Sequence, residues 1–148
     1  ALNLLTPHNK WTTHSTWSDN LVMLTLGRGG PVIWISETDA AKLDLKDNDW
    51  IEAVNMNGST IARACVSQRI PEGAVYMYHN QGRTVNVPLS PTTGKRGGLH
   101  NSISRICPKP THMAGGYAQF SFALNYMGTI GANRDEFVLL RCLDHVEW

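Results

Sequence analysis

The amino-acid sequence predicts a mainly β domain, a barrel or a sandwich, with two short helices and one long polar loop. Short apolar segments follow one another in the first half of the chain, and tight-turn residues separate them. The dipeptide Asn57-Gly58 lies between two segments of strand character. At 148 residues the chain has the length of one domain and can bury a hydrophobic core.

The first two predicted strands are continuous apolar runs. Leu21–Leu26 ends at a Gly-rich turn that contains Arg28, and Val32–Ile35 follows it. Because neither run alternates apolar with polar residues, we expect both to be strands that are buried on two faces.

A short helix is expected after the second strand. Ser36 can accept a hydrogen bond from the backbone N–H three residues further on, and Glu37 and Asp39 suit the positive end of a helix. These residues predict a helix from Glu37 to Leu43. The Asp-Asn-Asp sequence at 47–49 is typical of the turn that would follow.

The clearest local signal is a hairpin. Trp50–Met56 and Thr60–Val66 have strand character and flank Asn57-Gly58, a pair that tolerates the positive φ of a two-residue turn. A second turn is expected at 69–73, and it leads to a further strand over Ala74–Tyr78.

The second half of the chain has a different character. Residues 80–109 are rich in Gly, Pro, Ser, Thr and Arg, and so long a loop in a compact domain is usually functional or disordered. A second helix is expected after it, although Gly115-Gly116 weakens the pattern, because apolar residues recur at steps of three and four. They are Met113, Tyr117, Phe120, Leu124 and Met127, and Phe137–Leu143 predicts the last strand.

Composition excludes several classes of protein. A net charge of +1 gives no bulk attraction to nucleic acid, and no apolar run approaches the length of a transmembrane helix. The first ten residues are not expected to be a signal peptide. Cys65, Cys107 and Cys142 are too far apart for a disulfide or zinc framework, which fits a reducing compartment. Charged residues make up 17%, which indicates either a partly covered surface or an ordinary neutral domain.

Six histidines are the most suggestive candidates for a binding site: His8, His14, His79, His100, His112 and His145. A neutral imidazole both donates and accepts hydrogen bonds, so it suits a heterocyclic ligand with ring nitrogens and a carbonyl. Each histidine could instead satisfy a local backbone group. No metal site is expected, because His8 and His14 have the wrong spacing for one helical face and no nearby carboxylate completes a ligand set.

Basic residues gather in two Gly-rich segments. Arg28 lies in GRGG, and Lys95 and Arg96 lie in TGKRGG. Both segments could contact a pyrophosphate or could be solvated turns, and TGKRGG lacks the P-loop spacing. No G-x-S-x-G motif supports a hydrolytic triad. The Gly58-Ser59 pair leaves open a self-cleaving pyruvoyl enzyme, but a hairpin turn explains it without chemistry.

Eight segments together carry a family resemblance. They are LTPH at 5–8, HSTWSDN at 14–20, RGGP at 28–31, DAAKL with DNDW between 39 and 50, MYH at 77–79, RGGLHNS at 96–102, PKPTHM at 108–113 and GANRDEFV at 131–138. The chain resembles the C-terminal molybdopterin-dinucleotide-binding domain of the dimethyl-sulfoxide-reductase superfamily. Within that superfamily it is most similar to the branch of the respiratory nitrate reductase alpha subunits.

The resemblance implies a double-psi β-barrel and a ligand, bis-molybdopterin guanine dinucleotide. It implies that residues 1–148 form one binding domain, a C-terminal fragment of a larger catalytic subunit. His8 stands where most relatives have arginine. The implied cofactor contacts are His8, His14, Ser15, Thr16, His79, His100 and Asn101. Weaker assignments are Arg28, Lys95 and Arg96, which would contact phosphate or guanine or would pack against the rest of the subunit. The histidines would tune the metal centre without ligating it.

The resemblance also implies a function for the whole protein. It would reduce nitrate to nitrite with electrons from quinol, and the isolated domain, which has no catalytic residues of its own, would be inactive. The implied partners are the remaining alpha-subunit domains, a beta iron–sulfur subunit and a gamma haem b membrane subunit, on the cytoplasmic side of the bacterial membrane. Residues 131–138 and the second helix are candidates for the face that packs on the other domains. The alternatives are the same domain of a nitrite oxidoreductase and a free-standing subunit that binds the dinucleotide.

Overall fold

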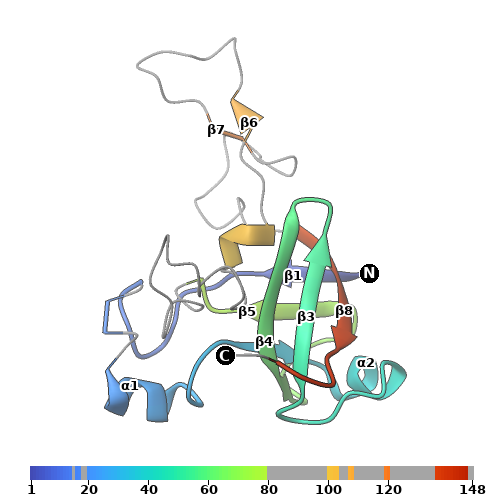
Figure 1. The fold of residues 1–148 in the computed structure, drawn as a ribbon, viewed down its shortest axis with the longest axis horizontal. Helices are drawn as coiled ribbons and strands as arrows, with labels where there is room; N and C mark the ends of the chain where they lie inside the picture. Colours follow the sequence, from blue (N-terminus) through green and yellow to red (C-terminus); the bar gives the residue numbers. More distant parts are fainter. Residues whose placement is uncertain are drawn as a thin grey trace.

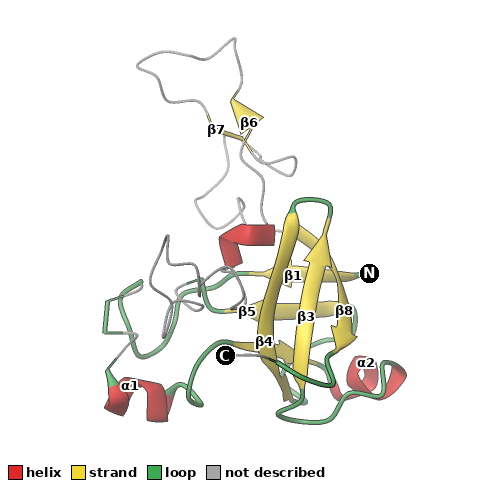
Figure 2. Ribbon diagram, in the orientation of Figure 1, coloured by secondary structure: helices red, strands yellow, loops and turns green. Residues whose placement is uncertain are grey.

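A closed β-barrel is the centre of the structure, a computed structural model (Figures 1 and 2). The structure describes residues 1–14, 16–17, 20–79, 100–103, 107–108, 119–120 and 136–146. Around the barrel the strands follow the order β1 (Leu2–Leu5), β5 (Ala74–Met77), β2 (Val32–Ile35), β4 (Gly58–Val66), β3 (Trp50–Asn55) and β8 (Glu136–Cys142). The predicted mainly β fold with a few short helices is confirmed, and the barrel excludes the sandwich alternative.

Two parallel strand pairs are built into the barrel. β1 pairs with β5 and β2 pairs with β4 in parallel, whereas the other neighbours are antiparallel. The last register pair of β1 and β5 joins Leu5 to Tyr76. Figure 1 shows these two strands side by side, with the chain that follows β1 leading to helix α1 (Leu21–Leu26). Because parallel strands end at the same edge, the residues that follow Leu5 and Met77 emerge together.

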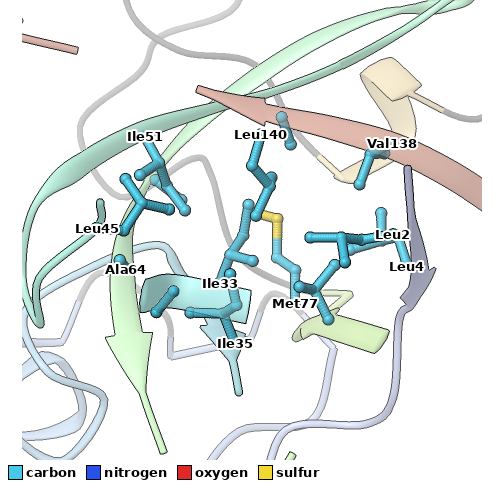
Figure 3. Close-up of a cluster of buried hydrophobic side chains, with 14 of the residues drawn as sticks. Leu2, Leu4, Ile33, Ile35, Leu45, Ile51, Ala64, Met77, Val138 and Leu140 are labelled. Atoms are coloured by element: carbon cyan, nitrogen blue, oxygen red, sulfur yellow. The ribbon is translucent and has the colours of Figure 1, made fainter. Parts of the chain in front are cut away.

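The barrel interior is the hydrophobic core (Figure 3). Alternate residues of a strand point to opposite faces, so one side chain in two is turned inward. β3 shows this with Ile51 and Ala53 buried between half-buried neighbours. The predicted strand at Val32–Ile35 is confirmed, and three of its four residues are buried. Three other predicted strands are also present. They are Thr60–Val66, Ala74–Tyr78 and Phe137–Leu143, which correspond to β4, β5 and β8.

Helix α2 (Glu37–Lys42) forms where its cap predicts it. The Ser36 hydroxyl accepts the backbone N–H of Asp39 at 3.0 Å, as expected, and also donates to the Asp39 carboxylate at 2.7 Å. Burial alone would raise the pKa of Asp39, but the N–H of Gly73, the Ser36 hydroxyl and Lys42 together hold it below its ordinary value. The cap therefore also ties α2 to the turn before β5.

The predicted hairpin is present, but its turn lies one residue earlier than expected. The register pairs Asn55 with Gly58, so Met56 and Asn57 form the turn. Neither of them has a positive φ. The Asn55 side chain accepts the backbone N–H of Asn57 at 2.8 Å, and this local hydrogen bond replaces the Asn-Gly turn chemistry.

The prediction of a buried strand at Leu21–Leu26 is wrong, because this segment is helix α1. The Asn20 side chain caps it by accepting from the backbone N–H groups of Val22 and Met23. Leucine and methionine are good helix formers, and the segment gains no burial in the barrel. Leu21 is 80% exposed and Val22 is 65% exposed.

The long polar loop lies largely outside the described residues. Within it the structure describes a 3-10 helix, η2 (His100–Ile103), and β6 (Cys107–Pro108), which pairs with β7 (Gln119–Phe120). The helix predicted around Phe120 is therefore wrong at Gln119 and Phe120, and its other residues are not described. In the described part of the chain, no helix is long and apolar enough to cross a membrane.

The barrel core should be far more sensitive to truncation than the hairpin tip. Met77 is fully buried, whereas Met56 is 98% exposed. Met77→Ala should lower the free energy of unfolding by about 2–5 kcal/mol, because it removes apolar contacts and leaves a cavity. Met56→Ala should change it by no more than about 0.5 kcal/mol. Urea unfolding of the two variants measures both values, and equal losses would contradict the assigned core.

Candidate functional site

Four of the six histidines come together where β1 and β5 end. His8 follows β1, His79 follows β5, His14 lies in the connection to α1, and His100 begins η2. The ring centroid of His79 lies 4.6 Å from that of His8, 4.8 Å from that of His14 and 6.0 Å from that of His100. The His8 and His14 centroids are 5.6 Å apart. We call these four residues the histidine cluster.

Parallel pairing of β1 and β5 positions the first two members. His8 lies three residues beyond Leu5, and His79 lies three residues beyond its register partner Tyr76. The backbone N–H of His79 donates to the Pro7 carbonyl at 3.2 Å, which continues the contact between the chains past the strand ends. The two imidazoles therefore meet because the strands run in the same direction.

The His79 ring is the buried centre of the cluster, with 5% of the residue exposed. Its Nδ1 lies 3.0 Å from the Pro7 carbonyl oxygen, which can only accept, so Nδ1 carries the proton. Its Nε2 lies 2.8 Å from Nδ1 of His14. In neutral His79 this Nε2 accepts, so His14 donates through Nδ1 and keeps Nε2 as an acceptor. The Pro7 carbonyl thus sets the tautomers of two rings.

A tight turn brings His14 back to His79. The φ of His14 is +51°, a left-handed conformation that is uncommon outside glycine. The Thr12 hydroxyl donates to the His14 carbonyl at 3.1 Å, and the N–H of Thr16 donates to the Thr13 carbonyl at 3.0 Å. His14 and His8 are exposed, so the cluster presents two imidazoles to solvent beside a buried one.

Arg28 is engaged in an ion pair. Its guanidinium donates to the Asp47 carboxylate at 2.7 Å and also contacts the buried Cys65 sulfur. The hydrogen bond to Asp47 raises the pKa of Arg28, and burial raises the pKa of the Cys65 thiol. The Arg28–Asp47 ion pair therefore links the loop between α1 and β2 to the turn at 47–49. The ion pair is partly exposed, so it contributes little to stability.

The structure brings some of the predicted site residues together but not all of them. The histidine cluster contains His8, His14, His79 and His100, Thr16 lies in the turn that carries His14, and Asn101 lies in η2. Arg28 faces Asp47 instead. Ser15, Lys95 and Arg96 lie outside the described residues. Contacts to a cofactor remain predictions for all of them.

Two features of the site were not singled out from the sequence. The Thr6 hydroxyl is buried and has no hydrogen-bond partner within the described structure, although it directly precedes Pro7 and His8. An unsatisfied buried hydroxyl is uncommon and calls for a partner. No strand is predicted at 2–5 from the sequence, but Thr6 directly follows β1, and the leucines of that segment were a usable signal. The second feature is the contact of Asn55 and Asn57 with η2, which no local pattern indicates.

The histidine cluster has the chemistry to bind a planar heterocycle through hydrogen bonds. Imidazoles supply donors and acceptors in directions that their own partners fix. Among the residues that the structure describes, no group of three or more His, Cys, Asp or Glu side chains could hold a metal ion. The imidazoles of the cluster offer hydrogen-bond donors and acceptors to a bound molecule.

Known proteins resemble the chain at two levels. The family model described as "Molydopterin dinucleotide binding domain" matches residues 2–121. The chain is 61% and 62% identical over all 148 residues to the respiratory nitrate reductase 2 and 1 alpha chains of Escherichia coli, and spans 12% of each. Acetylene hydratase from Pelobacter acetylenicus has a similar fold, with a TM-score of 0.60 and 17% identity over 73% of this chain and 15% of that chain.

Removing the centre of the cluster should destabilise the chain. His79→Ala leaves the Pro7 carbonyl without its ring donor and removes a buried side chain, so it should cost about 1–3 kcal/mol. His145 is exposed and makes no ring contact with the cluster, so His145→Ala should stay within about 0.5 kcal/mol of wild type. Urea unfolding compares the two, and a His79 variant as stable as the His145 variant would refute the buried hydrogen-bond chain.

Proposed function

The chain belongs to the molybdopterin dinucleotide-binding domain family, and we propose that it binds bis-molybdopterin guanine dinucleotide in the alpha subunit of a quinol-linked nitrate reductase. The observation that carries the proposal is the histidine cluster, which gathers four rings from three separate parts of the chain: the β1–α1 connection, the end of β5 and the start of η2. The identity of 61% and 62% to nitrate reductase alpha chains supports the choice of parent enzyme.

The described residues fit a pterin. Its fused rings carry nitrogens and a carbonyl, so they need donors and acceptors on one edge, and the exposed rings of His8 and His14 offer both. The buried Thr6 hydroxyl adds a polar atom that has no partner within the described structure. The donor set is thus the one that a heterocyclic ligand needs, without a competing metal site among these residues.

The residues of the cluster would have distinct tasks. When bound, the cofactor supplies the molybdenum at which oxygen-atom transfer takes place. His79 holds His14 in one tautomer, so His14 presents a fixed acceptor to the ligand. Hydrogen bonds and charge close to the pterin influence the electronics of the centre, as outer-shell groups do in metal sites generally. Ser15, Thr16 and Asn101 would extend these contacts.

The Gly-rich segments would serve the pyrophosphate and guanine. Lys95 and Arg96 carry charge that can neutralise phosphate, and the neighbouring glycines allow close approach of the backbone. Arg28 would be the weaker contact, because Asp47 and Cys65 already engage both terminal nitrogens of its guanidinium. This assignment rests on residue type and on the family.

The parent protein would be a membrane-bound complex. Other alpha-subunit domains would ligate molybdenum and an iron–sulfur cluster, and the isolated chain would be inactive. A beta iron–sulfur subunit and a gamma haem b subunit would deliver the electrons of quinol on the cytoplasmic side of a bacterial membrane. The names of the relatives support a nitrate reductase, and the chain covers 12% of their length.

Histidine variants of the complete enzyme test the proposal. Acid hydrolysis of the wild-type complex should release GMP rather than CMP, in a two-to-one ratio to molybdenum. His8→Ala and His100→Ala should assemble, because neither ring is the buried centre, but should shift the midpoint potential of the Mo(V) signal in electron paramagnetic resonance. Nitrate turnover should change with it.

His145→Ala is the matched control, since it removes an exposed imidazole outside the cluster. It should leave the nucleotide content, the potential and turnover at wild-type values. Wild-type potentials in both cluster variants would exclude a pterin contact for these histidines. Release of CMP would exclude the guanine form.

A further inference from the structure

The β3–β4 hairpin holds the C-terminal end of η2. The Ile103 carbonyl accepts hydrogen bonds from the Nδ2 atoms of Asn55 at 2.6 Å and of Asn57 at 3.2 Å. The end of a short helix leaves carbonyls without helical partners, and here two side-chain amides satisfy one of them. The Ile103 side chain is fully buried in the barrel core. η2 is thus anchored at one end by both its backbone and its side chain.

The orientation of the Asn55 amide follows from its surroundings. Its Oδ1 accepts the backbone N–H of Asn57 at 2.8 Å, so the opposite atom must be the NH₂ group. That group donates to Ile103 and also to the Phe137 carbonyl of β8 at 3.2 Å. One amide therefore joins the hairpin turn, η2 and β8.

Gly58 allows the close approach that this contact needs. A Cβ built on Gly58 would lie against the Ser102 carbonyl oxygen at a distance that real Cβ atoms do not show. Any side chain at this position would push η2 away from β4. The glycine that predicts a hairpin turn is therefore needed for packing of β4 against η2.

The anchor lies one helical turn from a member of the histidine cluster. His100 begins η2, and a 3-10 helix has about three residues per turn. Its ring centroid is 6.0 Å from that of His79. We propose that Asn55, Asn57 and Gly58, the hairpin clamp, are positioning residues that set the place of His100 in the histidine cluster. The effect of this placement on a cofactor rests on the proposed function.

Structures of variant complexes test the positioning itself. In the complete enzyme, Asn57→Ala removes one of the two hydrogen bonds to Ile103 and keeps the shorter one, so the complex should assemble. Gly58→Ala keeps both amides but displaces the Ser102 carbonyl. By cryo-electron microscopy, both variants should move the His100 ring away from His79 while His8 and His14 stay in place. An unmoved His100 ring in both variants would overturn the proposal.

A double-mutant cycle tests whether the clamp acts through His100. Asn57→Ala should shift the Mo(V) midpoint potential in the same direction as His100→Ala, and the double variant should match His100→Ala alone. Additive shifts would overturn the proposal, because Asn57 would then act independently of His100. Ser36→Ala is the control: it removes a cap of α2, which Figure 1 shows well away from η2, and should leave the potential unchanged.

The two proposals fail in different ways. A displaced His100 ring together with a wild-type potential in His100→Ala supports the clamp and contradicts cofactor contact by His100. A shifted potential in His100→Ala together with wild-type behaviour of both clamp variants contradicts the clamp and leaves the proposed function intact.

Discussion

Parallel pairing between β1 and β5 is the constraint on which the site depends. These strands are distant in the chain, yet their register joins Leu5 to Tyr76, and both end at the same edge of the barrel. Pro7, His8 and His79 are therefore brought together by backbone geometry rather than by any attraction between imidazoles. The buried apolar interior fixes the register, because a slip of one residue would turn the core side chains of the shifted strand outward.

The Pro7 carbonyl determines which ring nitrogens of His79 and His14 donate hydrogen bonds and which accept them. Pro7 can only accept, so the proton on His79 is fixed, and the fixed His79 in turn orients His14. A turn with a left-handed His14 completes the arrangement at one side, and η2 brings His100 from another. Preorganised rings of this kind bind with less loss of conformational freedom than free side chains. The exposed imidazoles of His8 and His14 therefore suit a planar ligand that carries hydrogen-bonding atoms along one edge.

Local signals predicted much of the fold, and non-local contacts explain the errors. Ser36 capped its helix because an N-cap depends only on residues within one turn, and the continuous apolar run at Val32–Ile35 correctly indicated a strand. Leu21–Leu26 became an exposed helix because burial, which the strand prediction assumed, depends on distant partners. The histidines could be chosen by their chemistry, but their convergence depends on strand pairing that no local pattern encodes. The same holds for Asn55, whose partner Ile103 is 48 residues away.

Cryo-electron microscopy of the complete enzyme with its cofactor shows whether the histidine cluster contacts the pterin. We expect pterin density within hydrogen-bond distance of the His8 and His14 rings, with His79 behind them and hydrogen-bonded to the Pro7 carbonyl. A cofactor lying elsewhere, with the cluster covered by polypeptide, would contradict it.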